Sequence, residues 1–207
     1  AENDFVTNLT KEQLGKIAIG EFTSWDQVDP SYPAETIQVY SPGADSGTFD
    51  YFVEAVVAPL TLNADGKADV ALGEEALLGL EGAQFSEDDN VLGQGIESNK
   101  YALGYFGYAY YEANKNRLKA VGIQWDKNKV KEPVLPSEET VLNATYNPLS
   151  RPLFIYPSKA ALEKPEVKAF LEFYLENDAD IAEAAQYIPL SDEQKAEAQS
   201  AYEAFAG

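Results

Sequence analysis

The passage from residue 36 to residue 57 constrains the fold more than any other part of the sequence. Residues 36–40 alternate polar and β-branched or aromatic side chains, which is typical of a strand. Residues 41–47 contain a proline and two glycines and are expected to form a loop. From Thr48, apolar residues recur at helical spacing as far as Pro59. A strand, a glycine-containing loop and a helix in direct succession form a typical unit of α/β proteins.

The same alternation continues through the first 150 residues and predicts an α/β domain with a mainly parallel sheet. Thr10 followed by Gln13 predicts a helix that opens with a capping box. Further helices are expected over 108–117 and 138–142, and further strands over 101–106, 118–123 and 152–156.

Two parts of this region have a weaker pattern. Trp25 is surrounded by Thr, Ser and Asp, so we expect it in a polar turn. Residues 61–90 are acidic, and we expect short helices joined by loops at Gly66, Gly73, Gly79 and Gly82.

From Pro165 onward the pattern is helical only. Ser191 followed by Gln194 predicts a capping box that opens the last helix, over 191–205. The two preceding helices carry apolar stripes, one formed by Val167, Phe170, Leu171 and Tyr174 and the other by Ile181, Ala184 and Ala185.

The charge balance restricts the partners of the chain. Asp and Glu number 35 against 15 Lys and Arg, a formal net charge of −20. A field of this sign repels nucleic-acid phosphates and anionic lipid, so we expect no nucleic-acid partner. Apolar runs fall short of the ~18 residues of a membrane span, so the chain is not expected to cross a membrane.

The sequence contains neither Cys nor His. Thiolate nucleophiles, imidazole bases and His or Cys metal ligands are therefore excluded. A carboxylate-only metal site needs a pattern such as the EF-hand loop, which we do not find, so we expect no metal and no cofactor.

The loop before Thr48 is the candidate binding site. A glycine lets a ligand approach the backbone, and a helix N-terminus offers N–H donors and the positive end of the helix dipole. Ser46 and Thr48 add hydroxyls on either side of Gly47. This set of donors suits a tetrahedral oxyanion, although the same residues are also typical of an ordinary N-cap.

The segment S-P-G-A-D-S-G-T-F-D-Y-F, residues 41–52, closely resembles the phosphate-contacting segment of the phosphate-binding proteins of ABC importers. On this resemblance Asp45, Ser46, Gly47 and Thr48 are the expected phosphate-binding residues. Further blocks follow in the order usual for that family, at residues 86–92, 102–111, 118–121, 148–156 and 187–190.

The resemblance implies a type II periplasmic-binding-protein-like fold in which two lobes close on phosphate. Residues 5–147 would form lobe two, and residues 148–207 would supply a return strand and the C-terminal helices of an incomplete lobe one. It further implies non-catalytic capture of inorganic phosphate outside the cytoplasm, in the periplasm or at the cell surface, and delivery to an ABC transporter permease.

Two departures from the family pattern affect the site. The chain opens on A-E-N-D with neither an initiator Met nor a signal peptide. We therefore expect that the family's N-terminal part, which completes the phosphate cage, is missing, and that this segment or a neighbouring copy is a further partner. In addition, Pro42 stands where some members have an Arg, and the chain contains only two arginines, Arg117 and Arg151.

Other interpretations remain open at this point. Asp45 and Asp50 could serve as acid and base of a phosphoester hydrolase, although Asp50 also suits the first turn of a helix. A truncated binding-protein scaffold could have a structural or adhesive role. The acidic run 87–89 could hold a cation or simply start a helix, and the aromatic residues of 101–111 could stack on a sugar or form core.

Overall fold

The computed structural model describes residues 3–185 and 187–206. Within these, the chain divides into two compact units, one formed by the described residues up to Ser150 and one by those from Arg151 onward. Each unit is described by itself. The assignment of residues 5–147 and 148–207 to the two lobes of a binding protein stays a prediction.

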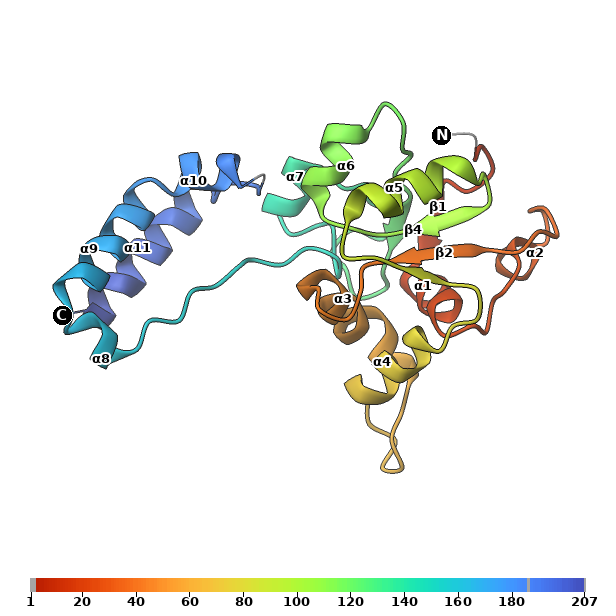
Figure 1. The fold of residues 1–207 in the computed structure, drawn as a ribbon, viewed down its shortest axis with the longest axis horizontal. Coiled ribbons are helices and arrows are strands. Elements are labelled where there is room, and N and C mark those ends of the chain that lie inside the picture. Colours follow the sequence, from red (N-terminus) through yellow and green to blue (C-terminus); the bar gives the residue numbers. More distant parts are fainter. Residues whose placement is uncertain (1–2, 186, 207) are drawn as a thin grey trace. The chain divides into compact units, whose positions relative to one another are not determined.

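The first unit contains a three-stranded sheet with β2 (Gln38–Ser41) in the middle (Figure 1). β3 (Gln84–Phe85) and β4 (Ala102–Gly104) flank it, both parallel to β2. A second parallel pair joins β1 (Asn8–Thr10) to β5 (Gly122–Gln124). Every pairing between these named strands is parallel, which confirms the predicted α/β fold with a parallel sheet.

Seven α-helices accompany these strands in the part of the first unit that the structure describes. They are α1 (Lys11–Ala18), α2 (Trp25–Val28), α3 (Gly47–Phe52), α4 (Val70–Leu78), α5 (Asp89–Ser98), α6 (Tyr108–Asn114) and α7 (Glu138–Leu142). α1 opens as predicted, because Thr10 Oγ1 accepts from Gln13 N at 3.1 Å and Thr10 N donates to Gln13 Oε1 at 2.9 Å.

We call residues 41–47 the glycine loop. The helix predicted after the glycine loop changes its winding twice. α3 continues as a π-helical turn over Val53–Val57 and as a 3₁₀ turn over Ala58–Leu60, which contains the expected helix-ending proline. The predicted apolar face is confirmed, because Phe49, Phe52, Val53 and Val56 are each at most 4% exposed. This helix therefore anchors the loop before it to the hydrophobic core.

Trp25 corrects the prediction of a polar turn. It starts the short helix α2, and its side chain is completely buried. Its Nε1 donates to the carbonyl of Tyr101 at 3.0 Å, so the one polar atom of the indole is satisfied inside the core. The polar neighbours of Trp25 in the sequence led to the prediction of a turn, although Trp25 is a large core residue.

Several boundaries differ from those expected. Gly73 lies inside α4 rather than in a loop, where an added Cβ would come within 3.2 Å of Val53 and Ala58. The strand expected over 118–123 is β5, shifted towards the C-terminus, and the one expected over 101–106 is the shorter β4. The short strands β1 and β3 were not predicted.

The prediction of a strand over residues 152–156 was wrong. Residues 151–158 have no regular secondary structure, and the apolar side chains of Leu153, Phe154 and Ile155 are at least 50% exposed. The run of apolar and aromatic residues suits a strand, but a strand forms only when a neighbour satisfies its backbone hydrogen bonds.

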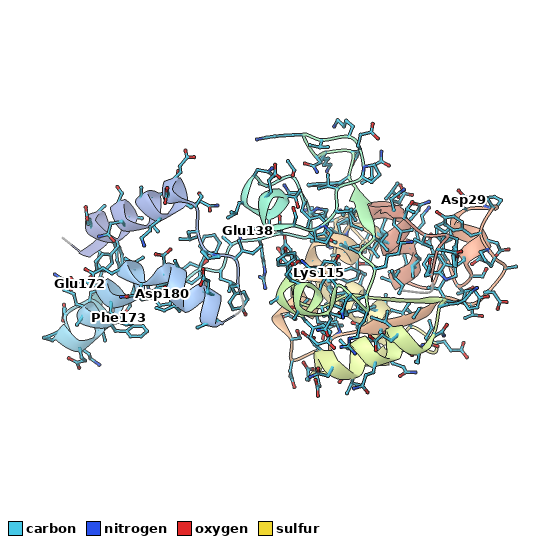
Figure 2. All side chains as sticks on the ribbon, turned by 90° about the horizontal axis from the view of Figure 1, so that it is seen from above. Asp29, Lys115, Glu138, Glu172, Phe173 and Asp180 are labelled. Carbon is cyan, nitrogen blue, oxygen red and sulfur yellow. The ribbon has the colours of Figure 1, made fainter. Side chains whose placement is uncertain are left out.

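The second unit is helical, as predicted. It contains α8 (Lys159–Leu162), α9 (Pro165–Glu176), α10 (Asp178–Ala184) and α11 (Asp192–Ala206). The cap at Ser191 is confirmed, since Ser191 N donates to Gln194 Oε1 at 3.0 Å. Figure 2 shows Glu172, Phe173 and Asp180 on these helices.

Apolar surface is exposed on this unit. Phe170 is 61% exposed and Phe173 is 59% exposed, whereas Leu171 between them is buried. The predicted stripe of Val167, Phe170, Leu171 and Tyr174 is therefore only partly covered by the described residues of the unit.

Beneath the glycine loop, β2 is tied to the residue that follows β4. The hydroxyls of Ser41 and Tyr105 lie 2.7 Å apart, and Ser41 Oγ also donates to Pro42 O at 2.9 Å. The Tyr105 ring stacks on Phe52 of α3, with centroids 3.9 Å apart. Ser41 is completely buried, so this bond forms largely out of water, where hydrogen bonds are strong.

We predict that the chain associates through the exposed apolar face of α9. Contiguous apolar patches above about 300–600 Å² are unusual on monomers. Light scattering should detect association with a second copy or with another polypeptide, and replacing both Phe170 and Phe173 by Glu should reduce it. Glu172→Gln on the same helix serves as the control. A monomeric parent with an ordered C-terminal unit would contradict this prediction.

We predict an alkaline loss of stability that depends on Tyr105. Burial raises the pKa of Tyr105, an effect that the bond to Ser41 only partly opposes. The folded chain therefore keeps the Tyr105 proton above pH ~10, where the unfolded chain releases its own. The contribution of this group to the free energy of unfolding is fully present below pH ~10 and decreases as the pH rises above it.

Tyr105→Phe should lower the free energy of unfolding at neutral pH by about 0.5–1.5 kcal/mol. It should also flatten the decline above pH ~10, because the titrating group is gone. Urea unfolding of parent and variant at a series of pH values measures both effects. Parallel curves at alkaline pH would show that Tyr105 is not the responsible group.

Candidate anion-binding site

The glycine loop lies at the carboxyl edge of the parallel sheet, where β2 ends at Ser41 and α3 begins at Gly47. β3 ends beside it, because Ser41 is opposite Phe85, and β4 ends beside it, because Tyr40 is opposite Gly104. Parallel α/β sheets bind ligands at this edge. The loop therefore occupies the expected place for a ligand site.

The start of α3 presents the predicted residues in direct succession. Ser46 is the N-cap, with extended backbone angles, and its Oγ accepts from Thr48 N at 3.2 Å. The loop is closed by Ser46 N, which donates to Gly43 O at 3.0 Å. This is the ordinary N-cap geometry for which Ser, Gly and Thr are typical. An anion placed here would compete with Ser46 Oγ for the Thr48 N–H.

The four predicted site residues differ in accessibility. Asp45 and Gly47 are exposed, while Ser46 and Thr48 are half-buried. Pro42 and Gly43, earlier in the loop, are buried and support it from the protein side. An approaching ligand can therefore reach the amides and hydroxyls of the helix start. Their role as phosphate ligands stays a prediction.

Glu87 contacts the loop and was missed as a site residue. The backbone N–H of Asp45 donates to Glu87 Oε1 at 3.3 Å. An ideal Cβ built on Gly43 would lie 1.9 Å from the same oxygen, so the glycine makes room for the carboxylate. A negative group of the chain itself thus accepts a hydrogen bond from the loop.

The reason for missing Glu87 lies in its neighbours. Of the two interpretations of the run 87–89, the structure agrees with the helix start, because Asp88 caps α5 and accepts from Asn90 N at 2.9 Å. Glu87 differs from Asp88 in position, since it lies two residues after the end of β3 and reaches the edge where the loop lies. Only the parallel pairing of β2 with β3 could have indicated this.

Asp50 lies in the first turn of α3 and is exposed. Its backbone N donates to Ser46 O at 3.1 Å. A carboxylate in the first turn stabilises a helix through the macrodipole. This position supports the helix-dipole interpretation of Asp50 over a role as an acid or base.

The aromatic run after β4 is mixed in its role. Tyr101 and Tyr105 pack against the core, while Phe106 and Tyr110 form an edge-to-face pair with centroids 5.0 Å apart. The side chains of α6 are all at least partly accessible, so the expected buried strand running into a helix is only partly correct.

The loop at residues 41–47 itself contains no Lys or Arg. Pro42 is buried at the position where some family members carry an Arg. Arg117 is paired with Glu97 at 3.1 Å. Within the described residues, no three or more Asp and Glu side chains gather as a metal site would require. The groups predicted to bind an anion at this edge are therefore amides and hydroxyls.

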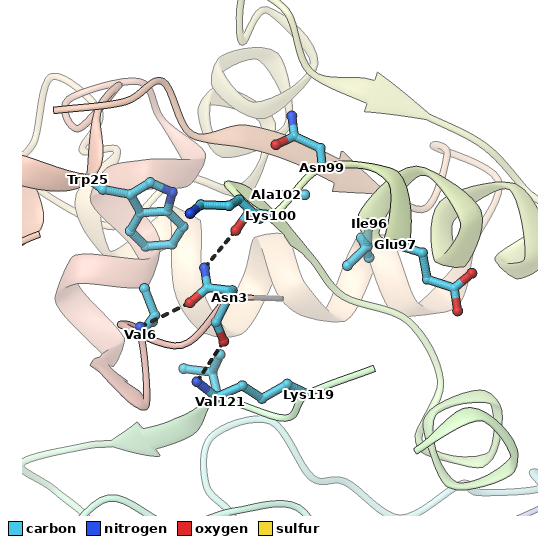
Figure 3. Close-up of a pocket in the computed structure, with 10 residues that line it drawn as sticks. All are labelled: Asn3, Val6, Trp25, Ile96, Glu97, Asn99, Lys100, Ala102, Lys119 and Val121. Atoms are coloured by element: carbon cyan, nitrogen blue, oxygen red, sulfur yellow. Dashed lines mark hydrogen bonds between the residues drawn. The ribbon is translucent and has the colours of Figure 1, made fainter. Parts of the chain in front are cut away.

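A small pocket lies at the opposite, amino edge of the sheet (Figure 3). Lys100 precedes β4 there, and its carbonyl accepts from Asn3 Nδ2 at 3.0 Å, while Lys119 Nζ donates to Asn3 O at 3.0 Å. The pocket has a volume of about 50 Å³.

None of the helices in the described ranges is long and apolar enough to cross a membrane.

Comparison with known proteins places the chain in a family. A family model described as the PBP superfamily domain matches residues 1–178. The protein SphX of Synechocystis is 44% identical over 197 residues, which cover 93% of this chain and 53% of SphX. The phosphate-binding protein PstS of Staphylococcus haemolyticus is 38% identical over 188 residues, covering 90% of this chain and 52% of PstS. The chain spans about half the length of the curated relatives it matches.

A solved structure agrees with these relatives. A possible phosphate binding protein from Planctomyces limnophilus superposes with a TM-score of 0.75 at 36% identity, covering 96% of this chain and 64% of that one. Its similarity extends over almost all elements of both compact units. With its parallel sheet and flanking helices, the chain has the type II periplasmic-binding-protein-like α/β fold and belongs to the PBP superfamily.

Proposed function

We propose that this chain captures inorganic phosphate at the start of α3, as part of the solute-binding component of an ABC phosphate importer. The observation that carries the proposal is the Ser46–Gly47–Thr48 helix start at the carboxyl edge of β2, in a chain of the PBP superfamily. Asp45 is the fourth proposed phosphate-binding residue. The names of the relatives, SphX and phosphate-binding protein PstS, support phosphate as the ligand.

Short-range donors explain how so acidic a chain binds an anion. The net charge of −20 repels phosphate at long range, but salt screens exposed charges beyond about 8 Å at physiological ionic strength. At contact, hydrogen bonds from amides and hydroxyls to a charged acceptor are worth about 1.5–3 kcal/mol each. Donors at one helix start therefore outweigh the screened field.

The proposed activity is binding without turnover. The Asp50 carboxylate lies in the first turn of α3, where it stabilises the helix, and the Asp45 carboxylate is exposed. A turnover screen on phosphate esters tests this point. Hydrolysis that disappears in Asp45→Asn would favour the hydrolase interpretation.

Location and transport partner follow from the same proposal. A binding component of an importer works outside the cytoplasm, and an ABC transporter permease would accept the phosphate from it. The N-terminal portion expected before this chain would supply the remaining phosphate contacts. Failure of the complete protein to bind any anion would favour a scaffold role instead.

The sharpest test is substitution at Gly47, in a form of the protein that carries the expected N-terminal portion. Gly47→Val should abolish phosphate binding measured by calorimetry, because a branched side chain would intrude where the anion meets the backbone. The fold should persist, since Gly47 is exposed. Phosphate binding as tight as in the parent would show that the site assignment is wrong.

Two further substitutions calibrate the site. Thr48→Val is nearly isosteric and should weaken binding by about 1–3 kcal/mol through loss of one hydroxyl donor. Asp50→Asn should change stability by only about 0.3–1 kcal/mol, as expected for a helix-dipole contact. Asp50→Asn is therefore the matched control within the same helix.

We also predict poor selectivity in the chain as it stands. Phosphate differs from sulfate by carrying a proton at neutral pH, and selection requires an acceptor for that proton. The family resemblance assigns the acceptor to the region before this chain. Calorimetry should therefore find similar, weak binding of both anions. A strong preference for phosphate would instead point to a carboxylate at the loop, Asp45, Asp50 or Glu87.

A further inference from the structure

Tyr51 connects α3 to a segment far away in the sequence. Its hydroxyl donates to Pro148 O at 2.8 Å and lies 3.3 Å from Ser150 O, across 97 and 99 residues respectively. We call residues 148–150 the exit segment, because Ser150 is the last residue of the first unit before the chain continues at Arg151. Figure 1 shows this part of the chain passing beside α3.

The neighbouring side chain, Phe52, holds α3 in another direction. Phe52 stacks on Tyr105, whose hydroxyl reaches Ser41 at the end of β2. Two adjacent residues therefore join the same short helix to the sheet and to the exit segment. The start of that helix, four residues before Tyr51, is Gly47 of the proposed phosphate site.

The chemistry of the contact favours a positional role over simple packing. Residues 148 and 149 of the exit segment lie in a turn, and the carbonyl of Pro148 accepts a hydrogen bond from the Tyr51 hydroxyl of α3. The hydroxyl of a tyrosine has one proton to donate and is attached to a rigid ring, so it holds its acceptor at a set distance from the helix. Phe would fill the same volume without that constraint.

We propose that Tyr51 is a positioning residue that couples phosphate binding at the start of α3 to the conformation of the exit segment. This inference rests on the proposed function. When an anion restricts the motion of the first turn of α3, the hydrogen bond of the Tyr51 hydroxyl also restricts the motion of Pro148 and Ser150. Conversely, the conformation in which the chain leaves the first unit affects the affinity of the site.

The test is Tyr51→Phe in the protein with its expected N-terminal portion. Phosphate affinity should fall by about three- to tenfold, the equivalent of one net hydrogen bond. Phosphate should slow hydrogen exchange at the amides of Leu149 and Ser150 in the parent and have little effect there in the variant. Tyr202→Phe is the matched control, since its hydroxyl meets Glu172 at 3.4 Å within the second unit.

The outcomes separate the two proposals. A parent that binds no phosphate overturns the proposed function and this inference with it. A parent that binds phosphate while Tyr51→Phe binds equally well, or shows the same protection of Leu149 and Ser150, overturns the inference alone. Faster exchange in the variant without phosphate, with unchanged affinity, would show that the contact only stabilises the fold and would also overturn it.

Discussion

The site depends above all on the parallel pairing of β2 with strands on both sides. Because all three strands run in the same direction, they end at one edge, and the residues that follow them meet there. Glu87 after β3 contacts the loop after β2, and Tyr105 after β4 contacts Ser41, the last residue of β2. A helix start at this position is presented to solvent yet supported by the core beneath it.

Local patterns in the sequence were sufficient to predict those elements whose backbone hydrogen bonds are formed by residues close in the sequence. The capping boxes at Thr10 and Ser191, the buried face of α3 and the helical tail were all predicted, because each depends on residues within one or two turns. The S-G-T start of α3 was found in the same way. Its geometry follows from a strand, a loop and a helix that are adjacent in sequence.

The contacts that join distant segments could not be predicted. The buried indole of Trp25 has its acceptor in Tyr101, and Glu87 contacts the candidate loop because β3 lies next to β2. The strand expected over 152–156 illustrates the converse. Its run of apolar and aromatic residues suits a strand, but a strand also requires a neighbour, and no local pattern shows whether one is present.

The close approach of Glu87 to Gly43 has an evolutionary consequence. The space at residue 43 is filled by a carboxylate from another segment, so the two positions share one volume. A larger residue at 43 is compatible with the loop only if residue 87 becomes shorter or turns away. Among homologous chains the two positions should therefore change together, and a glycine at 43 should accompany a long acidic side chain at 87.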